Sequence, residues 1–164
     1  MASIFLLFSG AFAQDAPPGP SDSPAAASIE ALDAENGSQG AAFSTALSAF
    51  EGMSLVEGSP EGWAKYARSG DTLSFGAARL SSNSYSFYAD QLGRVALEAG
   101  GVDCERLLSE LQSRYGAGVR QNEALEETWW VGQKVDLQFS NADQRCVAVF
   151  ESKDVLELST AGHS

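Results

Sequence analysis

The feature that most constrains this chain is the recurrence of apolar residues at every second position. The clearest case is KVDLQF at 134–139, where each apolar residue follows a charged or amide residue. Successive strand side chains point to opposite faces, so this pattern predicts a strand with one apolar and one polar face. Similar strands are predicted over 53–57, 64–68, 72–75, 85–89 and 94–99. The segment RCVAVFES at 145–152 is apolar on both faces, which predicts a central strand.

One segment, VDCERLLSELQSRYG, breaks the alternation. Its apolar residues share one helical stripe: Leu107, Leu108, Leu111 and Tyr115. We predict a helix over 103–115 with Asp103 as N-cap, a hydrophobic staple between Val102 and Leu107, and Gly116 as an αL C-cap. A shorter, weaker helix is predicted over 29–34. One or two helices packed on a mostly antiparallel sheet define an α+β domain.

The two ends of the chain differ in composition from its middle. MASIFLLFSGAFA predicts a signal peptide over 1–13 with cleavage near Ala13, although its positive n-region is missing. That apolar stretch is too short to span a bilayer. Residues 14–28 are rich in Pro, Ser and Ala and predict a disordered linker. The single domain is expected over 29–158, followed by a flexible tail over 159–164.

The chain has two cysteines, Cys104 and Cys146. Export to an oxidising compartment would favour a disulfide between them, and their spacing fits no zinc or haem motif. Two separate buried thiols are the alternative. The helix would carry one cysteine and the last strand the other, so a bridge would tether the helix to the sheet. Closing a loop of this length stabilises a fold by about 4 kcal/mol.

Charge and residue content exclude several functions. The net charge of −12 argues against nucleic acid and against anionic membrane surfaces. The only histidine, His163, lies in the tail, which makes a Ser–His or Cys–His nucleophile improbable. No glycine-rich phosphate loop and no metal-ligand set is found in the sequence, so no cofactor is expected.

The adjacent Trp129 and Trp130 must point to opposite faces of a strand. If Gly132 and Gln133 form a two-residue type II′ turn, Trp130 points into the core and Trp129 points outward beside Asp136. A three-residue loop would exchange the two.

We therefore take Trp129, Asp136 and Lys134 as a candidate binding surface. The alternative is that another element covers Trp129, because large aromatic side chains are rarely left bare. The same two interpretations, an exposed binding residue or a residue covered by another element, apply to Trp63.

A catalytic alternative rests on the acidic residues before the tryptophans. Glu126 and Glu127 could act as the carboxylates of a small glycan hydrolase, with a nearby indole to stack on a sugar. A solvated acidic loop explains the same residues in so acidic a chain.

Several short motifs follow one another in order: Tyr66-Ala67-Arg68, Phe75-Gly76, Tyr85-Ser86-Phe87-Tyr88, Tyr115-Gly116 and Trp130-Val131-Gly132. Their order resembles that of a group of small exported bacterial proteins of unknown function. The similarity covers roughly 37–152, although the group's aromatic, arginine and glycine of the first strand are Ser38, Gln39 and Ser44 here. The resemblance implies export, an α+β fold and a hairpin containing Trp130. It implies no catalytic residues.

These observations together predict an exported, periplasmic or secreted domain of the bacterial cell envelope. Its expected role is non-catalytic, as an interaction or ligand-binding accessory domain for a protein or glycan. The alternatives are the carboxylate-dependent hydrolase and an inhibitor or immunity-type protein that binds a basic partner. An apolar face around Trp129 could equally form a homodimer.

Overall fold

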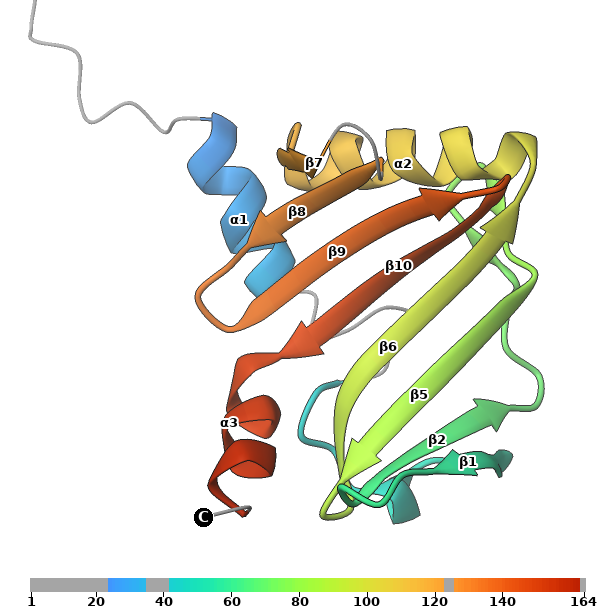
Figure 1. Cartoon of the computed structure of the whole chain (residues 1–164), viewed down its shortest axis with the longest axis vertical. Helices are drawn as coiled ribbons and strands as arrows, with labels where there is room; N and C mark the ends of the chain where they lie inside the picture. The colour runs from blue at the N-terminus through green and yellow to red at the C-terminus, as the bar shows by residue number, and fades with distance from the viewer. Residues whose placement is uncertain (1–23, 35–41, 123–125, 163–164) are drawn as a thin grey trace, which may run out of the picture.

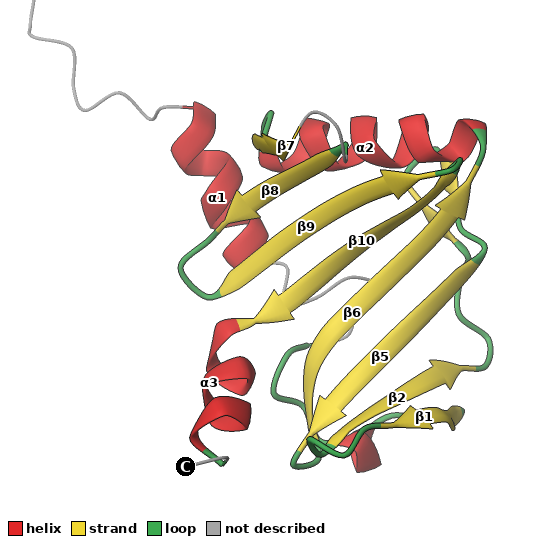
Figure 2. Cartoon of the chain, in the orientation of Figure 1, coloured by secondary structure: helices red, strands yellow, loops and turns green. Residues whose placement is uncertain are grey.

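The computed structural model describes residues 24–34, 42–122 and 126–162. The expected signal peptide over 1–13 and His163 lie outside these ranges. The described part is an α+β fold, as the alternation predicts (Figures 1 and 2).

An eight-stranded antiparallel sheet dominates the fold, in the order β1-β2-β5-β6-β10-β9-β8-β7. The strands are β1 Met53–Gly58, β2 Trp63–Arg68, β5 Ser82–Tyr88, β6 Gln91–Gly100, β7 Val119–Asn122, β8 Glu127–Val131, β9 Val135–Ala142 and β10 Arg145–Ser152. A small hairpin is formed by β3 Ser74–Phe75 and β4 Ala78–Arg79. The strand β10 pairs with β6 on one side and β9 on the other, which confirms its predicted central place.

Three α-helices accompany the sheet: α1 Pro24–Ala34, α2 Val102–Tyr115 and α3 Lys153–Ala161. A 3-10 turn, η1, covers Leu47–Ala49. In Figure 1, α2 crosses one end of the sheet and α3 follows β10 at the opposite end. The helix α1 contacts α2 and β9.

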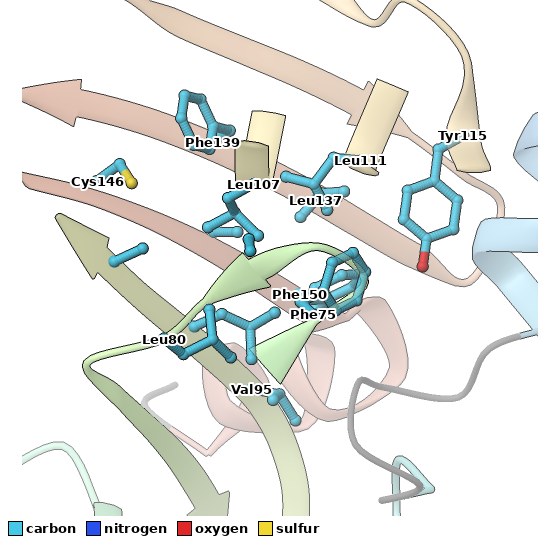
Figure 3. Close-up of a cluster of buried hydrophobic side chains, with 14 of the residues drawn as sticks. Phe75, Leu80, Val95, Leu107, Leu111, Tyr115, Leu137, Phe139, Cys146 and Phe150 are labelled. Atoms are coloured by element: carbon cyan, nitrogen blue, oxygen red, sulfur yellow. The ribbon is translucent and has the colours of Figure 1, made fainter. Parts of the chain in front are cut away.

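The sheet has a core face and an open face. On the core face, the buried residues of β9 and β10 alternate with partly exposed ones, and α2 packs on this face with Leu107, Leu111 and Tyr115 (Figure 3). The hairpin β3–β4 contributes Phe75, whose ring lies 6.4 Å from that of Phe150. Leu32 of α1 is also fully buried in this cluster. The apolar stripe predicted for the helix therefore forms the centre of the core.

The start of α2 differs from the prediction. Its N-cap is Gly101, so Asp103 lies inside the first turn, and Val102 is too exposed to form a staple with Leu107. The Asp103 carboxylate instead accepts a hydrogen bond from the backbone N–H of Arg79 at 3.1 Å. That bond, with the guanidinium of Arg106, holds the pKa of Asp103 below its ordinary value. The Asp103 side chain therefore binds the β3–β4 hairpin and does not cap its own helix.

The predicted end of α2 is correct in position. The C-cap is Gly116, and its φ of 85° requires glycine. Its ψ of −176° lies outside the left-handed helical region, so the αL conformation is wrong in detail.

A disulfide joins Cys104 in the first turn of α2 to Cys146 in β10, with the two Cα atoms 5.6 Å apart. Both cysteines are buried. The predicted pairing is confirmed, and it tethers the helix to the central strand of the sheet.

The helices at both ends of the fold extend beyond the predicted domain of residues 29–158. The first helix begins at Pro24, inside the segment predicted as linker. The expected tail also contains the end of α3, which runs to Ala161 and buries Ser159. Ser152 caps this helix because its hydroxyl accepts from the backbone N–H of Val155.

The β8–β9 turn is stabilised by an acid from α1. The Asp33 carboxylate accepts hydrogen bonds from the backbone N–H groups of Gln133, Lys134 and Val135, at 2.8–3.0 Å. Burial alone would raise the pKa of Asp33, but these three donors and the charge of Lys153 together hold it below its ordinary value. The first helix and the hairpin are thus linked by one ionised side chain.

We expect Asp33→Ala to lower the free energy of unfolding by about 1.5–3 kcal/mol at pH 7, because it removes hydrogen bonds to a charged group. The folded-state pKa lies below the unfolded one, so this stabilisation is complete above the unfolded value, near pH 4, and is lost as pH falls through the folded pKa. Urea unfolding at pH 7 and at low pH measures the difference. Glu30→Ala, at an exposed position on the same helix, is the control. An equal loss at both pH values would contradict an ionic role for Asp33.

Candidate functional site

The two adjacent tryptophans point to opposite faces of β8. Trp130 is 3% exposed and lies in the core. Its indole Nε1 donates a hydrogen bond to the carbonyl oxygen of Gly116 at 2.8 Å, so it also joins β8 to the end of α2. Trp129 is partly exposed on the open face. The predicted core position of Trp130 is confirmed.

The turn that led to this prediction is different. Val131 pairs with Asp136, so four residues, Gly132 to Val135, separate this register pair in place of two, and the backbone N–H of Gly132 donates to the carbonyl oxygen of Val135. Adding two residues to a hairpin loop leaves every side chain on the same face, because the period of a strand is two. The predicted faces of Trp129 and Trp130 are therefore correct although the predicted turn is wrong.

The open face carries a row of side chains that crosses six strands. In cross-strand register from β7 to β5 the row contains Val119, Trp129, Gln138, Val149, Ala96 and Ser84. We call this set the transverse row. Val119 is 64% exposed, and Val131, next to Trp129 on the same face, is 58% exposed. The β7–β8 end of the row is thus an exposed apolar surface centred on a tryptophan.

Charged pairs line one side of the transverse row. Asp136 lies on this face, with one carboxylate oxygen 3.2 Å from the Lys153 ammonium. Glu151 forms an ion pair with Arg94 on the neighbouring strand. The third residue of the predicted surface, Lys134, lies in the β8–β9 turn, where its backbone N–H is bound by Asp33. The structure thus brings Trp129 and Asp136 together on one face and leaves Lys134 at the end of the hairpin.

On the other side of the transverse row, Glu98 and Glu127 lie at the two ends of a short strip formed by Val147 and Ser140. Val147 pairs with Glu98 on β6 and with Ser140 on β9. Glu127 lies two residues before Trp129 and therefore on the same face. Glu98 and Glu127 are partly exposed, and they belong to none of the ion pairs described above.

Trp63 lies at the other end of the open face and has structural contacts. The Arg94 guanidinium lies 4.2 Å from the centre of its ring, and the ring of Tyr88 lies 5.5 Å away. A side chain at Gly93 would come within 2.7 Å of both Trp63 and Val155 of α3. Glycine at this position therefore lets α3 pack against the tryptophan. Trp63 helps to attach the last helix.

The two acids of the catalytic alternative, Glu126 and Glu127, have different surroundings. Glu126 is exposed, with a positive φ of 47°, and its carboxylate accepts a hydrogen bond from Asn141 Nδ2 at 2.8 Å. Glu127 begins β8 on the open face. Glu126 lies in the turn before the strand, so no regular strand geometry directs the two carboxylates toward one reacting centre.

A polar hollow of about 460 Å³ lies between the residues that precede β1 and the turn after β2, lined by Glu51, Gly52, Arg68, Ser69, Gly70, Asp71 and Thr72. Its acid Asp71 accepts a hydrogen bond of 2.5 Å from the hydroxyl of the buried Tyr85. Burial, and then this carboxylate, raise the pKa of Tyr85 well above its ordinary value. The Tyr85 proton therefore stays on the phenol and holds the Asp71 turn against the sheet.

The fold and this surface define the class of the protein: an α+β domain with one face of its antiparallel sheet covered by helices and the other largely open. Comparisons with known protein families, curated proteins and solved structures find no match. Within residues 24–34, 42–122 and 126–162, no group of three or more His, Cys, Asp or Glu side chains could hold a metal ion. None of the helices in these ranges combines the length and the apolar character needed to cross a bilayer.

Proposed function

We propose that this chain is a non-catalytic binding domain of the bacterial cell envelope, and that its partner docks on the β7–β8 end of the open face. The observation that carries the proposal is the apolar surface formed by the exposed Val119 and Val131 around the partly exposed Trp129. Exposed aromatic and aliphatic side chains beside charged groups are typical of interaction surfaces. The helices α1 and α2 lie on the core face and leave this surface uncovered.

The edges of the sheet are less suitable for a partner than its face. The strand β1 has a bulge between Leu55 and Glu57, and β7 has one between Arg120 and Asn122. A bulge interrupts the ladder of N–H and C=O groups that an added strand would need. Both outermost strands are interrupted in this way. A partner is therefore better accommodated by side chains on the face than by strand addition.

The proposed location is periplasmic or extracellular. The apolar stretch at 1–13 and its cleavage pattern near Ala13 support it. The disulfide between Cys104 and Cys146 supports it independently, because structural disulfides persist in oxidising compartments.

The proposal is tested by capture of envelope proteins on the immobilised mature chain. We expect capture by the wild type and a loss of at least about tenfold with Trp129→Ala or Val131→Ser, since an anchor residue contributes about 1.5–2 kcal/mol or more. Leu55→Ser is the matched control, because it removes an exposed apolar side chain from β1, far from the surface. Urea unfolding checks that each variant remains folded. Equal capture by wild type, Trp129→Ala and Val131→Ser would reject the surface.

A further inference from the structure

We infer that a groove between α2 and β7 is a second binding site, and that it takes the carboxylate end of an N-acylated apolar amino acid. The free compound and the C-terminal residue of a peptide share this chemistry. The groove lies on the core side of β7 and β8, and the surface proposed above lies on their other side. The inference is therefore independent of the proposed function.

The groove lies where the end of α2 leads into β7 (Figure 1). Its volume is about 310 Å³. Sites for small ligands begin at about 300 Å³, so the groove has room for a small molecule or for the end of a longer one. Its lining residues are Leu108, Gln112, Ala117, Gly118, Arg120 and Thr128.

Thr128 brings a buried hydroxyl group to the groove. This residue is only 5% exposed, yet its side chain lines the groove. Its methyl group lies close to Gly118, where an added side chain would come within 2.6 Å of it. Among residues 24–34, 42–122 and 126–162 we find no hydrogen-bond partner for the Thr128 hydroxyl. Buried hydroxyl groups are normally hydrogen-bonded, so this one indicates a position for a polar atom of a ligand.

Arg120 supplies a cation beside this hydroxyl. Arg120 pairs in register with Thr128, so the two side chains lie on the same face of neighbouring strands. Arg120 is exposed, and we find no ion pair for it within the described part of the chain. A guanidinium and a hydroxyl can both donate hydrogen bonds to one carboxylate. The net charge of −12 repels anions from most of the surface, so an unpaired arginine gives this groove a preference that its surroundings lack.

The wall formed by α2 fits the rest of an acylated amino acid. Gln112 donates from Nε2 to the carbonyl oxygen of Ala117 at 3.4 Å, which leaves its Oε1 as an acceptor. The amide N–H next to the ligand carboxylate is a donor for this oxygen. Leu108 is partly buried against the core and provides an apolar contact for the ligand side chain. An acylated apolar amino acid matches all of these groups, whereas a simple anion matches only the cation and the hydroxyl.

The test is an NMR titration of the isotope-labelled, full mature chain with N-acetylvaline. At millimolar concentrations we expect shifts confined to the backbone amides of Gly118, Arg120 and Thr128 and to the indole N–H of Trp130, which lies beside Gly118. N-acetylvalinamide lacks the carboxylate and should bind at least about tenfold more weakly. A short peptide that ends in valine distinguishes the two sources. Tighter binding than N-acetylvaline indicates a peptide terminus, and equal or weaker binding indicates the free compound.

Variants test the assignment of the groups. Arg120→Gln should lower the affinity for N-acetylvaline at least about tenfold. Thr128→Val keeps the shape of the buried side chain and should lower it about three- to tenfold. Arg145→Gln removes an exposed arginine of β10 and is the matched control, which should leave the affinity unchanged. Trp129→Ala, on the opposite face of β8, should also leave it unchanged.

Three results would each overturn the inference: no localised shifts, equal binding of N-acetylvaline and its amide, or an equal loss of affinity with Arg120→Gln and Arg145→Gln. Urea unfolding checks that Thr128→Val remains folded. If it does not, Arg120→Gln carries the test, because Arg120 is exposed. None of these results affects the docking surface on the open face.

Discussion

Trp130→Ala is expected to lower the free energy of unfolding by about 3–5 kcal/mol, the range for removing a large aromatic side chain from a core. Trp130 is 3% exposed, and its truncation leaves a cavity between β8 and the end of α2. The substitution also leaves the carbonyl oxygen of Gly116 without its indole donor. A side chain at Gly118 would come within 2.7 Å of the indole, so the core is tightly packed on this side of Trp130. Urea unfolding of the wild type and the variant measures the loss.

Trp130→Phe separates the two contributions. Phenylalanine keeps most of the apolar volume but cannot donate the hydrogen bond, so we expect a loss of about 1–3 kcal/mol. Trp129→Ala is the second comparison, because Trp129 lies on the open face and its loss should cost less than that of Trp130. A larger destabilisation by Trp129→Ala than by Trp130→Ala would contradict the assignment of the two faces.

Removing the disulfide should have an effect of similar size. We expect the double substitution Cys104→Ala and Cys146→Ala to lower the free energy of unfolding by about 4 kcal/mol. The bridge joins cysteines that are 42 positions apart and closes a loop that contains most of α2 and all of β7, β8 and β9. Without it, the unfolded chain gains the conformational freedom of that loop. Thermal and urea unfolding, compared with the oxidised wild type, measure the change.

Reduction of the wild-type protein provides the control for the disulfide. Unfolding under strong reductant should match the stability of the double variant within about 1 kcal/mol, because both lack the same covalent constraint. A double variant as stable as the oxidised wild type would show that packing alone holds α2 on the sheet.

The fold could be predicted from the sequence where its pattern is local and strong. The alternation at 134–139 and 145–152 predicted β9 and β10, and the stripe of Leu107, Leu111 and Tyr115 predicted α2. The third helix was missed because its apolar residues are few. Ser152 followed by Asp154 in the first turn is the capping signal that could have revealed it.

The candidate surface could be predicted only in part. Adjacent residues of a strand must face opposite ways, so one of the two tryptophans had to leave the core. The strand β7 was not predicted, and with it the placement of Val119 across from Trp129 was missed. The ion pairs that engage Arg94 and Lys153 join residues far apart in the chain. No local pattern contains that information.

The alternation alone determined which side chains share a face, and it placed Trp130 in the core even with the wrong turn. That result is robust because the period of two is a property of each strand, and a loop longer by two residues leaves it unchanged. The tertiary structure decided the strand order β6-β10-β9-β8-β7 and therefore the composition of the transverse row. Strand order depends on packing and loop closure between distant segments, and these are set by the whole fold.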